Sequence, residues 1–221
     1  MSVALIWGSP GSGKTVAATA PKNKKILLLC SDNSSIVLNM FDRKNVTVER
    51  VEHWLDPGDG QNYLTKQLEN ALSSGKYTLI VVDNLTDIKE MALLEIQEQG
   101  AIKDIRQVYQ AVYMAIKRIT RMAANAKCDV TFTTWDDYEE ITRNDGTTAL
   151  RMQPNLPSKI LPQVLGLCNI VGQMAKAKDK DGNMRYFLIT EDSETRYGCK
   201  DQIYGRKSCM PENLFEAPAK N

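Results

Sequence analysis

The sequence is poor in residues that bind transition metals. It has one histidine, and none of its five cysteines forms a C-x-x-C pair with another. Structural zinc sites take four such ligands, commonly in closely spaced pairs, so the composition argues against a zinc protein. The cysteines are odd in number and scattered, which favours free thiols in a reducing compartment over a disulfide framework. They are Cys30, Cys128, Cys168, Cys199 and Cys209.

Long apolar runs and a strong net charge are also missing. No stretch approaches the roughly 20 apolar residues that a membrane-spanning helix needs. Met1-Ser2 leads directly into an apolar segment, unlike a secretory signal peptide. We therefore expect a cytoplasmic protein without a membrane partner. The formal net charge is only +1, whereas proteins that cover DNA electrostatically are usually more basic, so any nucleic-acid surface must be local.

A glycine-rich phosphate-binding motif lies close to the start of the chain. Residues 8–15 follow the pattern G-x-x-x-x-G-K-T, between an apolar strand at residues 3–7 and a run of helix-forming residues. The glycines allow a tight turn whose backbone N–H groups approach a phosphate, and the N-terminus of the next helix favours the negative charge. We expect Lys14 to reach the β- and γ-phosphates of ATP and Thr15 to ligate Mg²⁺. The predicted ATP-binding residues are Gly8, Ser9, Pro10, Gly11, Ser12, Gly13, Lys14 and Thr15.

The rest of the chain predicts an α/β fold. Continuous apolar runs, typical of buried parallel strands, cover residues 25–30, 77–84 and 128–135, and residues 45–51 alternate as a further strand. Helical periodicity covers residues 61–73, 85–98 and 104–125, the first after a turn at 56–60. We expect a twisted, mainly parallel sheet flanked by helices.

Antiparallel hairpins are expected in the C-terminal third. Asn144-Asp145-Gly146 is a strong hairpin turn between residues 140–143 and 147–151. A short helix from Ser158 precedes two more strands, 169–174 and 184–189, joined across 179–183. Residues 191–221 are predicted to form a loop-rich or partly disordered tail. With no repeat and no low-complexity linker, one domain spanning residues 1–221 is the simplest organisation.

A second nucleotide-site residue follows from the strand at residues 77–84. This apolar run ends in Asp83, as the Walker B motif does. The carboxyl ends of parallel strands are where α/β sheets bind ligands, so Asp83 is expected to hold Mg²⁺, through a water molecule. The alternative is that Asp83 only caps the following helix.

The order of these parts resembles the RecA-like ATPase core. More closely, the chain resembles the small phage-encoded AAA/RecA-like proteins of the Sak4 group, which are single-strand annealing recombinases. The segments that carry the resemblance are residues 4–15, 79–87, the helix around Arg106-Gln107-Val108-Tyr109, and Leu156-Pro157-Ser158-Lys159. The resemblance implies a Mg²⁺-dependent ATPase that binds single-stranded DNA, assembles as a homo-oligomer and works with a single-stranded-DNA-binding protein in phage recombination, in the cytoplasm of a bacterial host.

Three positions depart from the usual pattern of the RecA-like family. Asp32 stands where a glutamate commonly activates the attacking water, so it is the candidate base, with a loop or helix-capping role as the alternative. The sensor position, often glutamine, falls near Thr134, with Thr133 as the other choice. Lys200 is the candidate finger that reaches a neighbouring subunit's γ-phosphate, with Arg196 or Arg206 as substitutes, although a solvated tail lysine is the alternative.

Two other functions stay open at this point. One is a P-loop small-molecule kinase, for which Arg143 and Arg151 on the predicted hairpin would form the lid. The other is a non-hydrolysing module in which ATP orders an assembly surface, because Asp32 is one methylene shorter than the usual glutamate. No DNA-binding residue is assigned, since residues 171–210 hold eight Lys/Arg against six Asp/Glu. Aromatic residues among them could stack on bases, namely Tyr186, Phe187, Tyr197 and Tyr204.

Overall fold

The protein is described here by a computed structural model that covers residues 1–54, 56, 63–98, 104–178 and 181–218. The helices are α1 (Lys14–Ala18), α2 (Leu64–Ser74), α3 (Leu85–Glu98), α4 (Ile105–Ala124) and α5 (Leu161–Leu167), with 3₁₀ turns η1 (Asn33–Met40) and η2 (Pro211–Asn213). The strands of the N-terminal part are β1 (Val3–Trp7), β2 (Ile26–Cys30), β3 (Val46–Arg50), β4 (Leu79–Asp83) and β5 (Asp129–Thr134). They are followed by β6 (Asp136–Thr142), β7 (Thr148–Pro154), β8 (Ile170–Lys178), β9 (Met184–Ile189), β10 (Lys200–Asp201) and β11 (Ser208–Cys209).

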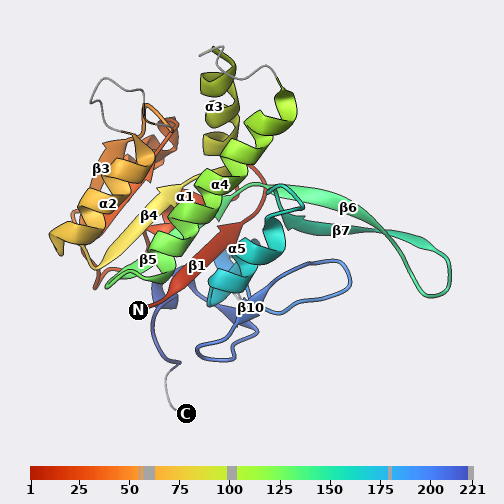
Figure 1. Cartoon of the computed structure of the whole chain (residues 1–221). Helices are drawn as coiled ribbons and strands as arrows, with labels where there is room; N and C mark the ends of the chain where they lie inside the picture. Colours follow the sequence, from red (N-terminus) through yellow and green to blue (C-terminus); the bar gives the residue numbers. More distant parts are fainter. Residues whose placement is uncertain (55, 57–62, 99–103, 179–180, 219–221) are drawn as a thin grey trace.

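Most of the strands form one sheet in the order β11-β9-β8-β1-β5-β4-β2-β3, with β10 paired to β8. The strands β8, β1, β5, β4, β2 and β3 run parallel to one another, and β9, β10 and β11 join antiparallel. The predicted fold class is therefore confirmed: the sheet is mixed, mostly parallel and flanked by helices, and the antiparallel strands belong to the C-terminal third. Figure 1 shows this sheet behind α2, α4 and α5.

The two faces of the sheet are buried by different parts of the chain. In β1, Leu5 and Trp7 pack with residues of α2, α3, α4 and α5, whereas Ala4 and Ile6 pack with α1. This alternation follows from the two-residue period of a strand, and both faces are apolar because both are covered. The central strands accordingly lack the polar alternation of a half-exposed sheet. Within the described parts of the chain, no helix combines the length and the apolar character needed to cross a membrane.

Strands β6 and β7 form a separate two-stranded hairpin that extends away from the main sheet (Figure 1). Thr142 pairs with Thr148, so the predicted turn lies at the tip. Gly146 has a φ of 82°, a left-handed value that favours glycine, and the Asp145 side chain accepts a hydrogen bond from Thr147 N at 2.9 Å. The strands are longer than predicted, because the pairing continues to the carboxyl end of β5.

Several expectations concern segments that differ in the structure or lie outside the described residues. Residues 33–40, for which the sequence analysis predicts no helix, form the 3₁₀ turn η1. The predicted helix 61–73 begins within the described residues at Leu64, and Gly75 ends it in a left-handed conformation with a φ of 61°. Most of the turn at 56–60 lies outside the described residues, as do residues 179–180 of the β8–β9 connection. Among residues 191–218, short strands and η2 are present.

Arg206, a substitute finger in the sequence analysis, is a structural residue here. Its side chain is 9% exposed and forms an ion pair with the fully buried Asp201. Its guanidinium also donates to Asn213 O at 2.8 Å and Leu214 O at 2.9 Å, carbonyls of the C-terminal segment. Arg206 therefore links the β10 region to the segment that covers α1, and it is not available to a neighbouring subunit's nucleotide.

We expect Arg206→Ala to lower the free energy of unfolding by about 3–5 kcal/mol, because it leaves the Asp201 carboxylate buried without its cation. Urea denaturation monitored by circular dichroism would measure this. Arg118→Ala is the matched control, since Arg118 pairs with Glu69 while 62% exposed and its loss should cost at most about 1 kcal/mol. Equal midpoints for the two variants would contradict a structural role for the Arg206–Asp201 pair.

Candidate nucleotide-binding site

The loop between β1 and α1 has the backbone of a phosphate cradle. Gly11 and Gly13 have φ values of 74° and 94°, which residues with a Cβ rarely adopt. Ser12 N donates to Ser9 O at 3.1 Å, and Ala17 N donates to Gly13 O at 2.9 Å, so the loop turns tightly into the helix. The predicted G-x-x-x-x-G-K-T motif thus lies in the strand–loop–helix context that it requires.

Lys14 lies across this loop. It is 7% exposed, and its Nζ donates to Gly8 O at 2.8 Å and Ser9 O at 2.9 Å. Burial lowers its pKa, and the nearby carboxylates of Asp83, Asp136 and Asp32 oppose this by favouring the charged form. The ammonium group therefore lies near three acids, and its hydrogen bonds within the described residues go to two neutral carbonyls, which a phosphate could replace.

Asp83 is the centre of the polar network beside the loop. It ends β4, is 2% exposed, and its Oδ2 accepts from Thr15 Oγ1 at 2.6 Å and from Ser34 Oγ at 3.1 Å. Its Oδ1 accepts from Thr133 Oγ1. Burial raises the pKa of Asp83, and the three hydroxyl donors only partly offset this. Hydroxyl and carboxylate oxygens are the ligand types that Mg²⁺ prefers, so Thr15 and Asp83 fit this ion.

The two threonines at the end of β5 point to opposite faces of the sheet, as successive strand residues must. Thr133, the second choice in the sequence analysis, faces α1 and bonds to Asp83. Thr134, the first choice as sensor, is fully buried, and its hydroxyl has no hydrogen-bond partner within the described chain. The structure thus brings the Thr133 hydroxyl to the site and turns the Thr134 side chain away from it, while Thr134 O accepts a hydrogen bond from Gly8 N at 3.3 Å.

Asp32 lies at the start of η1, immediately after β2. Its Oδ1 accepts a hydrogen bond from Ser34 N at 2.8 Å, which is a capping interaction. It also lies close enough to Lys14 and Asp83 to act on both charges. The structure brings Asp32 to the site, and its present hydrogen bond matches the alternative role named for it in the sequence analysis.

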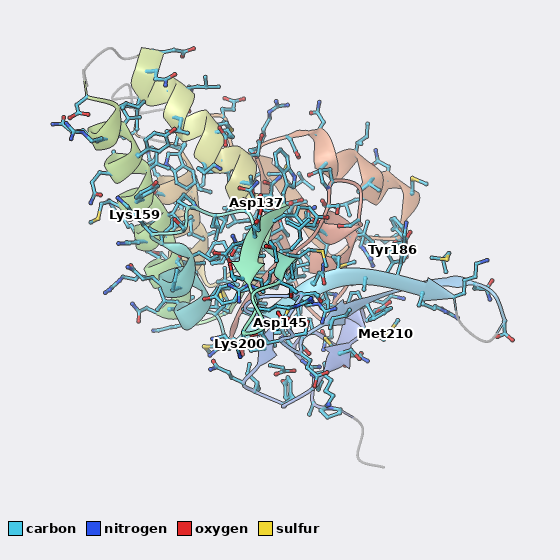
Figure 2. All side chains as sticks on the ribbon, turned by 90° about the vertical axis from the view of Figure 1, so that its right-hand side faces the viewer. Asp137, Asp145, Lys159, Tyr186, Lys200 and Met210 are labelled. Carbon is cyan, nitrogen blue, oxygen red and sulfur yellow. The ribbon has the colours of Figure 1, made fainter. Side chains whose placement is uncertain are left out.

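The two remaining finger candidates lie at different levels of β8. Lys200 pairs with Val171, which in turn pairs with Leu5 in the middle of β1. Burial lowers the pKa of Lys200. Arg196 donates through Nε to Gln173 Oε1 at 2.6 Å, and Gln173 pairs with Trp7, the residue before the P-loop. By these pairings Arg196 lies at the carboxyl edge of the sheet, whereas Lys200, which is labelled in Figure 2, lies level with the middle of β1.

The arginines that a kinase lid would require are engaged in local contacts. Arg143 forms an ion pair with Glu194, and Arg151 donates to Glu139 at 2.7 Å. The Arg151 guanidinium also lies 4.6 Å from the centre of the Tyr197 ring. Both side chains thus fix the hairpin against the loop that follows β9.

The sequence analysis missed two residues of this site. Ser34 bonds to Asp83, and Asp136, at the start of β6, accepts from Ser9 Oγ at 2.7 Å. A signal was available for both, because each lies just beyond the carboxyl end of a predicted parallel strand. The neighbours of those strands in the sheet were needed to show that they meet the P-loop.

Comparisons with known proteins give a match to a family model and matches to solved structures. The sequence profile of the AAA domain matches residues 2–201, a span that contains the P-loop, Asp83 and β1 to β9. No curated protein matches the sequence. Among solved structures, the chain is similar to the flagellar accessory protein FlaH from Methanocaldococcus jannaschii, with 10% identity, a TM-score of 0.47, and coverage of 94% of this chain and 83% of that one. It is also similar to a KaiC-like protein from Pyrococcus horikoshii OT3, with 10% identity, a TM-score of 0.44, and coverage of 85% and 77%.

Proposed function

Because the chain belongs to the AAA domain family of P-loop nucleoside triphosphatases, we propose that it binds ATP with Mg²⁺ at residues 8–15 and hydrolyses it. One observation carries this proposal: the buried carboxylate of Asp83 is hydrogen-bonded to Thr15 of the P-loop at 2.6 Å. Two motifs 68 residues apart in the sequence therefore form one site. This arrangement contributes little to the stability of the fold by itself, because burying a carboxylate is costly when hydroxyl groups, and no cation, are its hydrogen-bond donors among the described residues.

The chain's own groups would act on the phosphates as follows. Backbone N–H groups of the glycine loop bind the phosphate oxygens, and Lys14 exchanges its bonds to Gly8 O and Ser9 O for bonds to the β- and γ-phosphates. A bound Mg²⁺ would neutralise charge that develops on the phosphate oxygens. Thr15 and Asp83 would hold it, the latter through water. Thr133, which donates to Asp83, fixes the carboxylate and occupies the sensor position.

Activation of the attacking water is assigned to Asp32. Its carboxylate follows β2, the strand next to β4, so it lies on the same edge of the sheet as Asp83. To accept a proton from water, Asp32 would have to release or share its hydrogen bond to Ser34 N. This capping bond favours a second candidate function, in which ATP binds and orders an assembly surface with little turnover.

We further propose that the protein acts as a homo-oligomer in which Arg196, or else Lys200, reaches the nucleotide of a neighbouring subunit. Arg196 is the better candidate because it lies at the P-loop edge of the sheet, bonded to Gln173. A cation supplied in this way stabilises charge in the transition state and is worth on the order of 10³–10⁵ in rate.

We also propose that the protein acts in phage recombination, with single-stranded DNA and a single-stranded-DNA-binding protein as partners, as in the Sak4 group. It is supported by the resemblance of residues 4–15 and 79–87 to that group. A single domain over residues 1–221 is part of the same proposal.

We expect single-stranded oligonucleotide to raise the rate of ATP hydrolysis severalfold, and the stimulation to fall as salt rises, because phosphate contacts release counterions. Steady-state phosphate release with and without a poly-dT oligonucleotide, at low and moderate salt, measures both effects. Double-stranded DNA of the same length is the control.

ATP hydrolysis that the oligonucleotide does not stimulate at any salt concentration would contradict the DNA-dependent function and support an ATPase that acts without DNA. Tight ATP binding without turnover, with or without DNA, would instead support the second candidate function. Transfer of the γ-phosphate to a nucleoside acceptor would favour the kinase.

A further inference from the structure

The β6–β7 hairpin carries two large apolar side chains that the rest of the described chain leaves uncovered. Tyr138 on β6 is 58% exposed, and Leu150 on β7 is 62% exposed. Leu150 pairs with Glu140, which lies two residues after Tyr138, so the three side chains project from the same face of the hairpin. A two-stranded hairpin is marginally stable alone in water, and apolar side chains that gather on its exposed face indicate a surface that meets a partner.

The same hairpin is acidic. Residues 136–154 contain five Asp or Glu against two arginines. Both arginines are engaged, Arg143 with Glu194 and Arg151 with Glu139. Glu140 is exposed, and it forms no ion pair with a residue that the structure describes. The uncovered face therefore combines two apolar anchors with a carboxylate that a partner's cation could meet.

A basic cavity lies on another part of the molecule. It has a volume of about 1020 Å³ and follows the C-terminal half of α4, beside α5 and the segment that leads into α2. Lys117, Arg118 and Arg121 line it, and Asp56 is the one acid among its described lining residues. Arg118 pairs with Glu69 on α2, whereas Lys117 and Arg121 form no ion pair within the described chain. We call this hollow the α4 cavity.

The α4 cavity also has apolar walls and an unused hydrogen-bond donor. Met114, which is 55% exposed, lines it together with Met122, Tyr63 and Trp54. Trp54 is 2% exposed, and its Nε1 has no hydrogen-bond partner among the described residues, although a buried indole N–H usually finds one. The volume is at the upper end of the roughly 300–1,000 Å³ of small-molecule sites, so it suits a protein segment with apolar and acidic side chains.

We propose that the β6–β7 hairpin of one copy of this chain docks in the α4 cavity of a second copy. The two surfaces match in charge and in apolar character, which is the complementarity that selects partners at interfaces. Tyr138 and Leu150 meet the apolar walls, and Glu140 pairs with Arg121. The proposal rests on the homo-oligomer proposed above and assigns the surfaces that join its copies.

The positions of the two surfaces determine the kind of assembly. Figure 1 shows the hairpin projecting on one side of the molecule, with α2 and the C-terminal half of α4 on the other side. One chain therefore does not fill its own α4 cavity with its own hairpin. A contact between different surfaces of two copies is head-to-tail, and it generates a ring if the rotation closes or a filament if it does not.

The test uses two double variants of the full chain, each of which alters one surface. Tyr138→Ser with Leu150→Ser changes the hairpin, and Lys117→Glu with Arg121→Glu changes the cavity. Sedimentation velocity over a range of protein concentrations, with ATP and Mg²⁺, measures self-association. Each double variant should weaken it at least about tenfold, through loss of apolar anchors or through contact between like charges.

The matched control reverses two lysines away from both surfaces. Lys25→Glu with Lys44→Glu changes the net charge as much as the cavity variant does, at two exposed positions. Self-association of this control should stay within about twofold of the unmodified protein, because exposed charges outside an interface contribute little. Circular dichroism spectra of all three double variants should match that of the unmodified protein.

Mixing the two double variants tests the head-to-tail arrangement directly. The cavity variant keeps an intact hairpin, and the hairpin variant keeps an intact α4 cavity. The mixture should therefore form a dimer with one copy of each and no larger species, although neither variant associates strongly alone. A two-fold contact through other surfaces does not give this product.

Charge exchange gives a further readout. Glu140→Arg should weaken self-association at least about tenfold, and Arg121→Glu in the same chain should restore it to within about threefold, because the two charges change places. Undiminished association of both double variants, a mixture without the mixed dimer, or a lack of restoration would overturn the docking proposal. A monomeric unmodified protein would reject the proposed homo-oligomer as well, so the two failures are distinguishable.

Discussion

Replacing Lys14 by alanine should lower kcat for ATP hydrolysis by about 10³-fold or more, since cations that stabilise the transferring phosphoryl group contribute on that scale. The Nζ of Lys14 already lies within 2.9 Å of two carbonyls of the glycine loop. Removing Lys14 takes away the ammonium group that is expected to meet the γ-phosphate. Phosphate release under saturating ATP measures the change.

The control must separate chemistry from folding. Lys44→Ala removes a lysine whose side chain is 91% exposed and should leave hydrolysis within about twofold. Thermal unfolding of Lys14→Ala should be close to that of the unmodified protein, because the buried ammonium group has a pKa already lowered by burial and bonds only to two carbonyls. A folded Lys14→Ala protein with undiminished turnover would show that hydrolysis does not occur at this loop.

Asp83→Asn is the second variant with a large expected effect, and it should change activity and stability in opposite directions. Hydrolysis should fall by about 10²-fold, since the amide no longer supplies the negative charge that holds Mg²⁺ near Thr15. The free energy of unfolding without Mg²⁺ should rise, because burial raises the pKa of Asp83 and so penalises the ionised carboxylate in the folded state.

The sign of this effect sets its pH dependence. A carboxyl whose pKa is higher when folded binds its proton more tightly in the native state, so stability falls as pH rises above the unfolded pKa of about 3.9. The advantage of Asp83→Asn should therefore be absent below about pH 4 and grow above it. Urea denaturation at several pH values, with and without Mg²⁺, tests this, and Asp137→Asn on the exposed hairpin is the control.

Two outcomes would contradict this account of Asp83. Lower stability of Asp83→Asn at neutral pH would mean that the hydroxyl donors of Thr15, Ser34 and Thr133 outweigh the cost of burial. Added Mg²⁺ should stabilise the unmodified protein in the presence of ATP and not the variant. Equal stabilisation of both would show that the ion is held without Asp83.

The position of Thr133 illustrates the limit of sequence reasoning at this site. Both Thr133 and Thr134 end the same apolar strand, and the motif could not choose between them. The choice depends on which face of β5 looks toward α1, which follows from the pairing of β5 with β1 and β4. A shift of one residue in that register would exchange the two hydroxyls.

The sequence alone determined the parts whose physical cause is local. Glycines at fixed spacing before Lys14 and Thr15 specify a phosphate loop, and continuous apolar runs specify buried parallel strands with Asp83 at the end of one. These features hold whatever the neighbours are, because backbone freedom and apolar periodicity act within a few residues.

Only the tertiary structure decided which distant groups meet. It joined Asp83 to Thr15, Ser34 and Thr133, tied Ser9 to Asp136, and buried Arg206 against Asp201. It also brought Tyr186 to Gly13 across more than 170 residues of sequence. Such contacts depend on strand order and register, which are set by how whole faces of the sheet pack. A local sequence pattern does not specify which distant segment it will contact.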